Sequence, residues 1–220
     1  IDLSLTGVLR LKMVNRLIID EIDEMLDLGF RPQLTTILDV LPTKRQNLLF
    51  SATMTKEVDT LIKTFCVNPQ TIKTTPVGTP LDNIRQVGYI VPNYNTKINL
   101  LKDLLVNERE FKKVLIFTSS KKLADRLFEE IEDSFPKQIN VIHSNKAQNN
   151  RFNTVKQFID GTCRIVIATD LLARGLDIAD ITHVINFNTP DIPENYIHRI
   201  GRTGRADKQG TAITFILEQD

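Results

Sequence analysis

Three carboxylates follow an apolar segment near the start of the sequence. The stretch 16–23 reads Arg-Leu-Ile-Ile-Asp-Glu-Ile-Asp, which places Asp20, Glu21 and Asp23 at the end of a predicted strand. Open α/β sheets bind ligands at the carboxyl ends of their parallel strands. In phosphoryl-transfer enzymes an Asp in this place holds Mg²⁺, and a neighbouring acid can orient the attacking water. The same residues are equally typical of the acidic first turn of a helix, which the helix dipole stabilises.

A second polar cluster, Ser51-Ala52-Thr53, follows the predicted strand Leu48–Phe50. Its two hydroxyl groups can hydrogen-bond the acidic tetrad, Asp20-Glu21-Ile22-Asp23, if that tetrad follows a neighbouring strand. Hydroxyls are also typical N-caps, here for a helix that runs through Val58 and Leu61. Taken alone, the pattern favours the N-cap interpretation.

The stretch His198–Arg205, His-Arg-Ile-Gly-Arg-Thr-Gly-Arg, is the most informative part of the sequence. Its three arginines recur every three residues, and the glycines between them allow sharp backbone turns. Arg202 and Arg205 can therefore converge on one anion, because the planar guanidinium binds phosphate oxygens in pairs. A solvated basic loop is the alternative interpretation, but such a loop does not need this regular placement.

Polar groups also follow the predicted strand Arg164–Ala168. Thr169, Arg174 and the backbone near Gly175 can contact a phosphate backbone. Asp177 can accept a hydrogen bond from a ribose hydroxyl. A turn with a surface salt bridge explains these residues equally well.

The hydrophobic pattern predicts a regular scaffold that positions these motifs. Segments with apolar residues at i, i+3, i+4 and i+7, such as the one from Leu34 to Leu41, predict helices. The runs Val114–Phe117 and Ile165–Ala168 are apolar throughout, which is typical of strands buried on both faces of a parallel sheet. Strands and helices alternate, which predicts an α/β fold of parallel sheets flanked by helices. The predicted strands are Asn15–Ile19, Asn47–Phe50, Gln70–Lys73, Gln86–Val91, Lys113–Thr118, Asn140–His143, Arg164–Thr169, His183–Phe187 and Thr211–Leu217.

Composition narrows the possible partners. The chain has 28 basic and 27 acidic residues and a net charge of +1, so any polyanion must bind a local patch. Cys66 and Cys163 lack the spacing of a metal site or a disulfide framework, which favours free thiols in a reducing compartment. We therefore expect a cytoplasmic location, or a nuclear one in a eukaryote. No apolar run approaches the ~20 residues that span a bilayer, so we expect no membrane partner.

Together, the four motifs resemble those of the DEAD-box ATP-dependent RNA helicases, in that family's order and spacing and over essentially the whole chain. The resemblance implies two RecA-like lobes, with ATP bound between them and RNA across both. The expected domains are the C-terminal part of lobe 1 at 1–74, a Pro- and Gly-containing linker at 75–84, and lobe 2 at 85–220. The implied function is an RNA-dependent ATPase that locally unwinds or remodels single-stranded or short duplex RNA by ATP-driven lobe closure, with possible protein cofactors.

The resemblance also implies roles on the nucleotide side. Asp20 would be the Mg²⁺-side acid, acting through water, and Glu21 would orient the hydrolytic water. Arg202 and Arg205 would reach the γ-phosphate as arginine fingers, and Asp177 would contact the ribose. The expected cofactors are therefore ATP and Mg²⁺.

Two further sets of residues take their roles from the same resemblance. One set couples the lobes and consists of Asp23, Ser51, Thr53 and His198. The other contacts RNA and consists of Gln148, Arg151, Thr169, Arg174 and Gly175, together with the segment Ile116–Lys121.

The sequence departs from the family pattern in three places. Ile22 stands where the family has Ala, and Ser144 follows His143 where the family usually has Gly. None of the nine glycines is followed by Lys, so the Walker A loop that cradles phosphates is missing. We therefore expect an incomplete first lobe, and we predict that this chain alone does not hydrolyse ATP whereas its parent does. The alternatives are a non-catalytic RNA-binding or partner-docking module with a degenerate helicase fold, and a DNA translocase with similar lobes.

Overall fold

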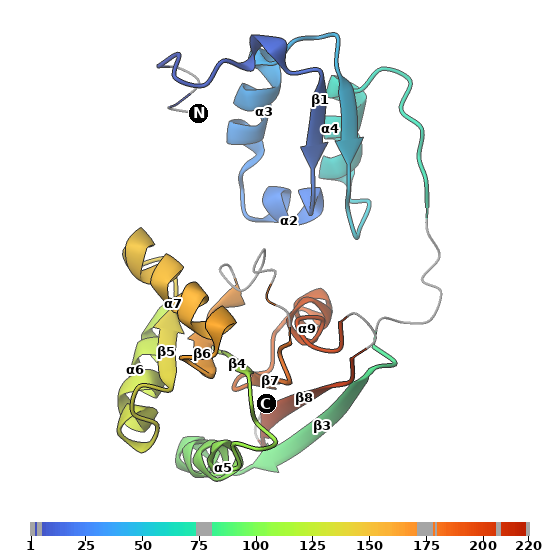
Figure 1. Ribbon diagram of the computed structural model, residues 1–220. Helices are drawn as coiled ribbons and strands as arrows, with labels where there is room; N and C mark the ends of the chain where they lie inside the picture. Colours follow the sequence, from blue (N-terminus) through green and yellow to red (C-terminus); the bar gives the residue numbers. More distant parts are fainter. Residues whose placement is uncertain are drawn as a thin grey trace. The chain divides into compact units, whose positions relative to one another are not determined.

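The computed structural model describes residues 3, 6–73, 81–170, 178, 180–205 and 208–218. The chain divides into two compact units, Ile1–Thr74 and Thr75–Asp220, and each is described here by itself. Both units are built from parallel strands and helices, so the predicted α/β class is confirmed (Figure 1). Within the described residues, no helix has both the length and the apolar character needed to cross a membrane.

The first unit contains two strands that pair in parallel, with Ile18 beside Leu48 in the register. Its hydrophobic core lies on one face of this pair and includes Ile19, Ile22 and Val58. Thr55 begins the last helix by accepting a hydrogen bond from the Val58 backbone N–H. In chain order the elements are η1 (Leu11–Met13), β1 (Arg16–Ile19), α2 (Ile22–Asp27), α3 (Arg31–Val40), β2 (Gln46–Leu49) and α4 (Lys56–Phe65).

One strand predicted for this unit is wrong. Residues Gln70–Lys73 are exposed and form no strand in the structure. Ile72 is the only apolar residue among them, and its side chain is 86% exposed. A single apolar side chain does not bury enough surface to hold an extended segment against a sheet.

The second unit contains a six-stranded sheet within the described residues, in the order β3-β8-β7-β4-β6-β5, with every neighbouring pair parallel. The predicted linker ends too late, because β3 begins at Ile84, which is buried and pairs with Gly210. The strands are β3 (Ile84–Val91), β4 (Val114–Phe117), β5 (Ile139–Ile142), β6 (Ile165–Ala168), β7 (His183–Asn186) and β8 (Gly210–Leu217). The helical segments are α5 (Tyr94–Val106), α6 (Lys121–Ile131), η2 (Glu132–Ser134), α7 (Gln148–Asp160) and α9 (Pro193–Ile200).

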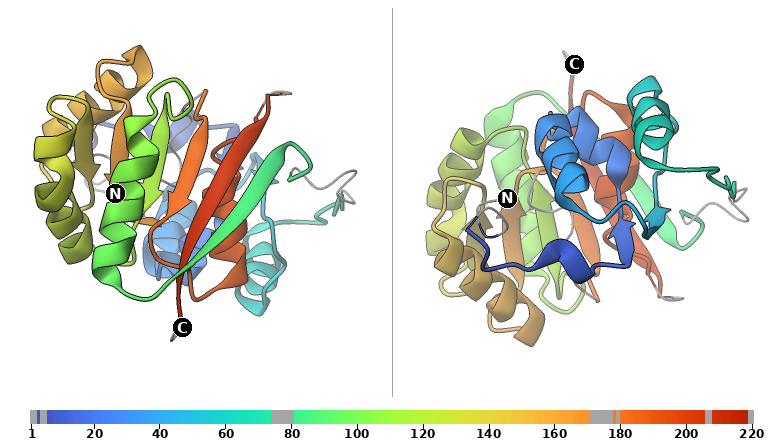
Figure 2. Two further views of the ribbon diagram at one scale, coloured as in Figure 1. Left: turned by 90° about the horizontal axis from the view of Figure 1, so that it is seen from below. Right: turned by 90° about the horizontal axis from the view of Figure 1, so that it is seen from above.

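Side chains of the central strands alternate between two hydrophobic clusters, one on each face of the sheet. Ile116 and its neighbours in the sheet pack with the apolar faces of α5 and α6. Leu115 and Phe117 belong to the other cluster, which includes Phe158 of α7. All residues of β4, β6 and β7 are buried, as predicted for strands covered on both faces. Figure 2 shows α5 lying across one face of this sheet.

Candidate functional site

The acidic motif of the first unit lies at the carboxyl end of β1. Asp20 follows the strand directly, and its Oδ1 accepts a hydrogen bond from the Glu21 backbone N–H at 2.9 Å. Glu21 adopts the left-handed conformation, with φ 52° and ψ 45°, immediately before α2. This conformation is unfavourable for a residue with a side chain, and such residues gather at functional sites. Asp20 and Glu21 are both exposed, so their carboxylates are accessible to a ligand.

The structure joins the two polar motifs of this unit. Asp23 Oδ2 accepts hydrogen bonds from the backbone N–H and the hydroxyl of Thr53, at 2.7 and 2.8 Å. The Ser51 hydroxyl donates to the Thr53 carbonyl oxygen at 2.6 Å, which holds the turn after β2 in shape. Because Thr55 caps α4, the N-cap interpretation of Ser51 and Thr53 is wrong. Parallel pairing of the two strands brings the hydroxyl cluster to the acidic tetrad.

Asp23 is almost completely buried, with 4% of its surface exposed. Burial raises the pKa of Asp23, but the hydrogen bonds from Thr53 outweigh burial and hold that pKa below its ordinary value. The carboxylate is therefore ionised at neutral pH. Its second oxygen, Oδ1, is buried and has no hydrogen-bond partner within the described structure. A buried carboxylate oxygen of this kind can accept a further hydrogen bond.

Ile22 stands where the DEAD-box family has Ala. Its side chain is fully buried in the hydrophobic core of the first unit, as is usual for an apolar residue.

In the second unit, the arginine segment begins in the last turn of α9 and continues into the turn that follows it. Arg202 Nε donates to the His198 carbonyl oxygen at 3.2 Å, and Arg205 Nε donates to the Gly201 carbonyl oxygen at 2.8 Å. Gly204 has φ +68°, and a Cβ there would lie 2.6 Å from the side chain of Ile84. The glycine therefore allows the sharp turn that the sequence predicted between the last two arginines.

A buried threonine anchors this turn to the residues that directly precede β7. The Thr203 hydroxyl donates to the carbonyl oxygen of Ile181, and it lies 3.3 Å from the carbonyl oxygen of Thr182. A Cβ on Gly210 would lie only 2.2 Å from the Thr203 hydroxyl oxygen, so position 210 leaves room for this anchor. The positions of Arg202 and Arg205 therefore depend on a side chain that is almost completely buried.

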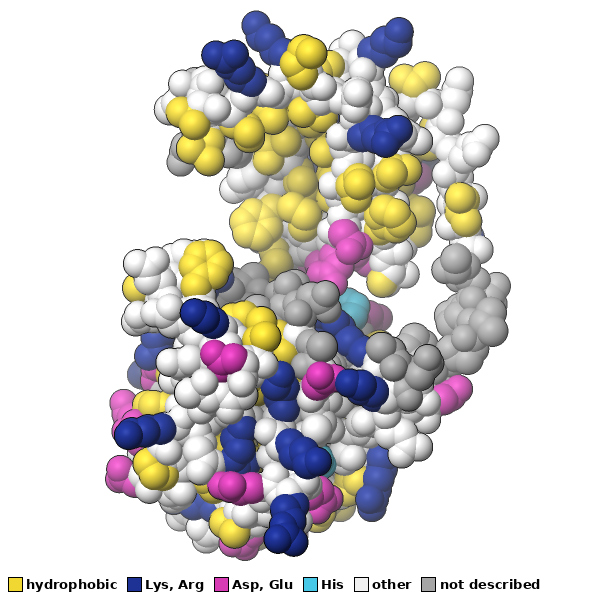
Figure 3. All heavy atoms as spheres, viewed as in Figure 1, with side chains coloured by type: hydrophobic (Ala, Val, Ile, Leu, Met, Phe, Trp, Pro, Cys, Tyr) yellow, Lys and Arg dark blue, Asp and Glu magenta, His cyan; other side chains and the backbone are white. Residues whose placement is uncertain are grey.

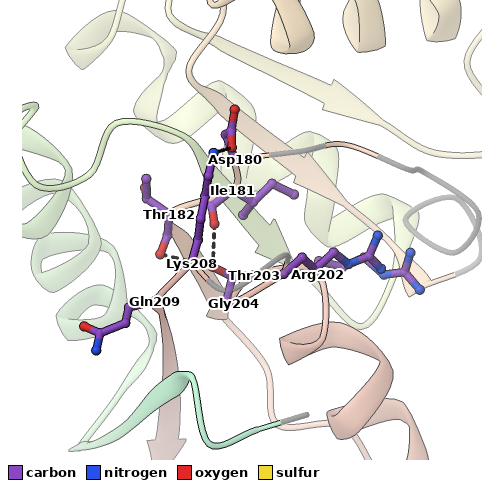
Figure 4. A pocket seen from close by; sticks show the side chains of 9 residues that line it. Asp180, Ile181, Thr182, Arg202, Thr203, Gly204, Lys208 and Gln209 are labelled. Carbon is purple, nitrogen blue, oxygen red and sulfur yellow. Dashed lines mark hydrogen bonds and ion pairs between the residues drawn. The ribbon is translucent and has the colours of Figure 1, made fainter.

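A cavity of about 200 Å³ lies beside the same turn. Three of its lining residues are basic, namely Arg202, Arg205 and Lys208, and one is acidic, Asp180. Figure 4 shows Lys208 extended toward Asp180, with which it forms an ion pair, and Thr203 directed at the Ile181 carbonyl. The excess of basic groups makes this edge of the unit suitable for an anion.

Arg199 has a role that the sequence did not reveal. Its side chain is 3% exposed and donates two hydrogen bonds to the carboxylate of Asp170, at 2.5 and 2.7 Å. Its third nitrogen donates to the Asn188 carbonyl oxygen at 2.8 Å, and its guanidinium lies over the ring of Phe117. Arg199 thus ties the ends of three strands to α9. The one sequence signal was Asp170, an acid two residues after the apolar strand β6, which requires a counter-charge when it is drawn toward the core.

Of the residues predicted to face RNA, those that the structure describes lie at the carboxyl ends of the central strands and at the start of α7. Thr169 follows β6, and the segment Ile116–Lys121 spans the end of β4 and the start of α6. Arg151 donates to the side-chain oxygen of Gln148 at 2.9 Å, so these two predicted RNA contacts touch each other. Arg174, Gly175 and Asp177 lie outside the described residues.

The loop between β5 and α7 contains Ser144, which stands where the family usually has Gly. Side chains of α6 hold this loop in place. Lys121 donates to the Asn145 side chain at 3.0 Å. Lys146 and the buried His143 both contact one oxygen of Asp125, at 2.8 and 2.9 Å. Burial raises the pKa of Asp125, but its bonds to His143 and Lys146 outweigh burial and lower that pKa overall. These contacts position the start of α7.

The donor set of the first unit fits Mg²⁺ only as a partial site. Asp20 and Glu21 offer the oxygen ligands that this ion prefers. Within the described residues, no group of three or more His, Cys, Asp or Glu side chains is arranged to hold a metal ion. A single carboxylate is nevertheless sufficient when waters and substrate phosphates supply the remaining ligands, as is usual for Mg²⁺.

Each of the two units is built on parallel strands flanked by helices, with acids at the carboxyl end of one sheet and arginines beside the other, which is the architecture of RecA-like domains. A family model described as the DEAD/DEAH box helicase matches residues 2–61, and one described as the helicase conserved C-terminal domain matches residues 96–207. The chain therefore belongs to the DEAD-box helicase family.

Named relatives and solved structures agree with this assignment. The chain is 41% identical to DEAD-box ATP-dependent RNA helicase 40 of Arabidopsis thaliana, over 98% of the chain and 20% of that relative. It is 39% identical to ATP-dependent RNA helicase DbpA of Bacillus subtilis, over 96% of the chain and 43% of that relative. The structure of S. cerevisiae Dbp5 bound to RNA and ADP BeF3 matches with a TM-score of 0.86 and 29% identity, over 99% of the chain and 57% of Dbp5. The chain thus spans less than half the length of these two curated relatives.

Proposed function

We propose that this chain is part of an ATP-dependent RNA helicase, that is, of an RNA-dependent ATPase that locally unwinds or remodels RNA. The observation that carries the proposal is the bond between Thr53 and Asp23, which joins the hydroxyl motif to the acidic tetrad at the carboxyl end of the sheet. The names of the relatives support it, since both are called ATP-dependent RNA helicases. The ligands proposed for the parent protein are ATP, Mg²⁺ and RNA.

The residues of the first unit would act as follows. Asp20 would hold Mg²⁺ through water, and the ion, when bound, supplies positive charge that neutralises the phosphates. Glu21 would orient the attacking water. Asp23, fixed by Thr53, would couple the two lobes together with Ser51, Thr53 and His198.

The residues of the second unit would supply charge to the reaction and hold the RNA. Arg202 and Arg205 would stabilise the γ-phosphate in the transition state, an effect worth roughly 10³–10⁵ in rate for an arginine finger. Gln148, Arg151, Thr169, Arg174 and Gly175 would contact RNA, and Asp177 the ribose of ATP. In this proposal RNA and ATP both favour the closed arrangement of the two lobes, so the binding of one ligand promotes the binding of the other.

A phosphate-release assay with and without RNA tests the proposal. The parent protein is expected to turn over ATP faster with RNA, and Arg205→Ala is expected to reduce that rate at least about 10³-fold. The 220 residues by themselves contain no Gly-Lys pair and are expected to show no turnover. RNA-stimulated turnover by the 220-residue chain, or a parent that RNA does not stimulate, would contradict the proposal.

A second candidate is a non-catalytic module that binds RNA or a protein partner. The missing Gly-Lys pair favours it, because without phosphate-cradling groups the remaining residues hold a nucleotide only weakly. One solved neighbour, S. cerevisiae Dbp5, is described as bound to Gle1 and IP6, which supports the proposal that this chain also has protein partners. A parent protein that binds RNA but hydrolyses no ATP under any condition would favour this candidate.

A further inference from the structure

Helix α7 exposes an aromatic ring beside two of the proposed RNA contacts. The side chain of Phe152 is 64% exposed, although phenylalanine is usually buried. Phe152 lies one helical turn after Gln148, at i+4, and therefore on the same face of the helix. It also directly follows Arg151, whose guanidinium donates to Gln148.

Packing does not account for this ring. The buried residues of α7 are Thr154 and Phe158, which lie on the opposite side of the helix from Phe152. Phe158 joins the core cluster on that face of the sheet, whereas Phe152 joins none of the hydrophobic clusters. The helix is therefore attached to the unit without help from Phe152.

The charges around the ring suit a polyanion. Helix α7 carries Arg151 and Lys156 but no acidic residue before its last position, Asp160. Lys156 is exposed and lies one turn after Phe152 on the same face. Beyond the start of the helix, Lys121 is also exposed and is held by its bond to Asn145. An exposed aromatic ring among basic and amide side chains is the composition of a surface that binds single-stranded nucleic acid.

We propose that Phe152 stacks against a base of single-stranded RNA whose phosphates contact Gln148 and Arg151. The proposal rests on the proposed function, because it assumes that this face of the second unit binds RNA. Stacking adds affinity without charge, so it does not depend on salt, whereas phosphate contacts lose affinity as salt rises. The two contributions can therefore be separated by measurement.

The test is the binding of a short unstructured RNA, followed by fluorescence anisotropy at several salt concentrations. Phe152→Ala is expected to weaken binding by about tenfold with no change in the dependence on salt. Phe152→Trp is expected to bind at least as tightly as the unmodified chain, because it retains an aromatic face. Ile159→Ala is the matched control, since Ile159 is 56% exposed on the same helix face but lies two turns farther from Gln148.

A second probe checks that the ring meets a base. An oligomer with the same sugar-phosphate backbone but no bases is expected to bind the unmodified chain and Phe152→Ala equally. If Phe152→Ala binds ordinary RNA as tightly as the unmodified chain does, or weakens both probes alike, stacking is refuted while RNA binding stands. If the unmodified chain binds neither probe, the proposed RNA-binding function fails together with the stacking. An Arg151→Ala variant that lowers the salt slope by about 0.7 would support the phosphate contacts independently.

Discussion

Strand β1 of the first unit and strand β4 of the second are both short, apolar and parallel to their neighbours, yet their surroundings differ. Every residue of β4 is buried, and its side chains enter hydrophobic clusters on both faces of the sheet. In β1 the side chain of Ile18 is 64% exposed and lies beside Leu48, which is also exposed. Figure 3 shows hydrophobic side chains gathered on the surface of the first unit, whereas charged side chains are spread over the second. An apolar strand therefore predicts pairing, but burial depends on what covers the sheet.

The largest expected difference between the units comes from truncating matched isoleucines. Ile116→Ala in β4 is expected to destabilise the second unit by about 3 kcal/mol, because it leaves a cavity in a close-packed core. Ile18→Ala in β1 is expected to change the stability of the first unit by less than about 0.5 kcal/mol. Hydrogen exchange during urea unfolding resolves the two units. Similar losses for both substitutions would show that Ile18 is packed in solution.

The next effect concerns the anchor of the arginine turn. Gly210→Ala is expected to destabilise the second unit by about 2 kcal/mol, because its Cβ would overlap the Thr203 hydroxyl and the backbone of Gly204. Gly88→Ala on the neighbouring strand is the control, since its Cβ would meet only the tip of Ile216 at 3.4 Å. The same unfolding experiment measures both variants. An equal effect of the two substitutions would mean that Thr203 moves away without loss.

A smaller loss of stability is expected in the first unit when the hydrogen bond between Thr53 and Asp23 is removed. Thr53→Val removes the hydroxyl that binds Asp23, and is expected to cost about 1 kcal/mol and to raise the pKa of Asp23. Thr53→Ser keeps the hydroxyl and is expected to lose much less stability. Urea unfolding and NMR titration of the carboxyl group provide the two readouts. Identical behaviour of the Val and Ser variants would assign the effect to packing instead.

The smallest expected effect is a difference in the response to acid. Burial lowers the pKa of His183 in the second unit below its ordinary value of 6.5, so the unfolded state binds the proton more tightly. Stability of this unit is therefore expected to fall as the pH drops below about 6.5. Residues 1–74 contain no histidine, and the lowered pKa of Asp23 makes its contribution to stability disappear only below about pH 3.8.

Unfolding measured from pH 7 to pH 4 tests this difference between the units. His183→Phe preserves an aromatic ring against Phe111 and is expected to remove the part of the decline that comes from this group. A first unit that weakens in parallel with the second over this range would contradict the assignment to histidine.

The sequence was sufficient where a local pattern decides the structure. Uninterrupted apolar runs correctly predicted the buried central strands of the second unit. Local patterns were insufficient where several residues fit the same role equally well and a contact between distant parts of the chain decides among them. Ser51 and Thr53 match an N-cap as well as Thr55 does, and only the pairing of β1 with β2 brings Thr53 to Asp23.

The arginines show the same limit more clearly. Arg199, Arg202 and Arg205 are evenly spaced, and their spacing does not show which of them pairs with an internal carboxylate. In the structure Arg199 is fixed by the carboxylate of Asp170, which is 29 residues away in the chain. Arg202 is buried as well, so burial alone does not single out Arg199. The strand order decides which guanidinium meets Asp170, because β4, β6 and β7 end side by side at this point.

The left-handed backbone at Glu21 bears on attempts to engineer a more robust protein. Glycine would relieve the steric strain at this position by about 1 kcal/mol, so a stability-guided redesign would select Glu21→Gly. That same change would delete the carboxylate that we propose orients the attacking water. Position 21 is therefore a place where thermal robustness and turnover are in direct competition, and screening by melting temperature alone would choose the wrong residue.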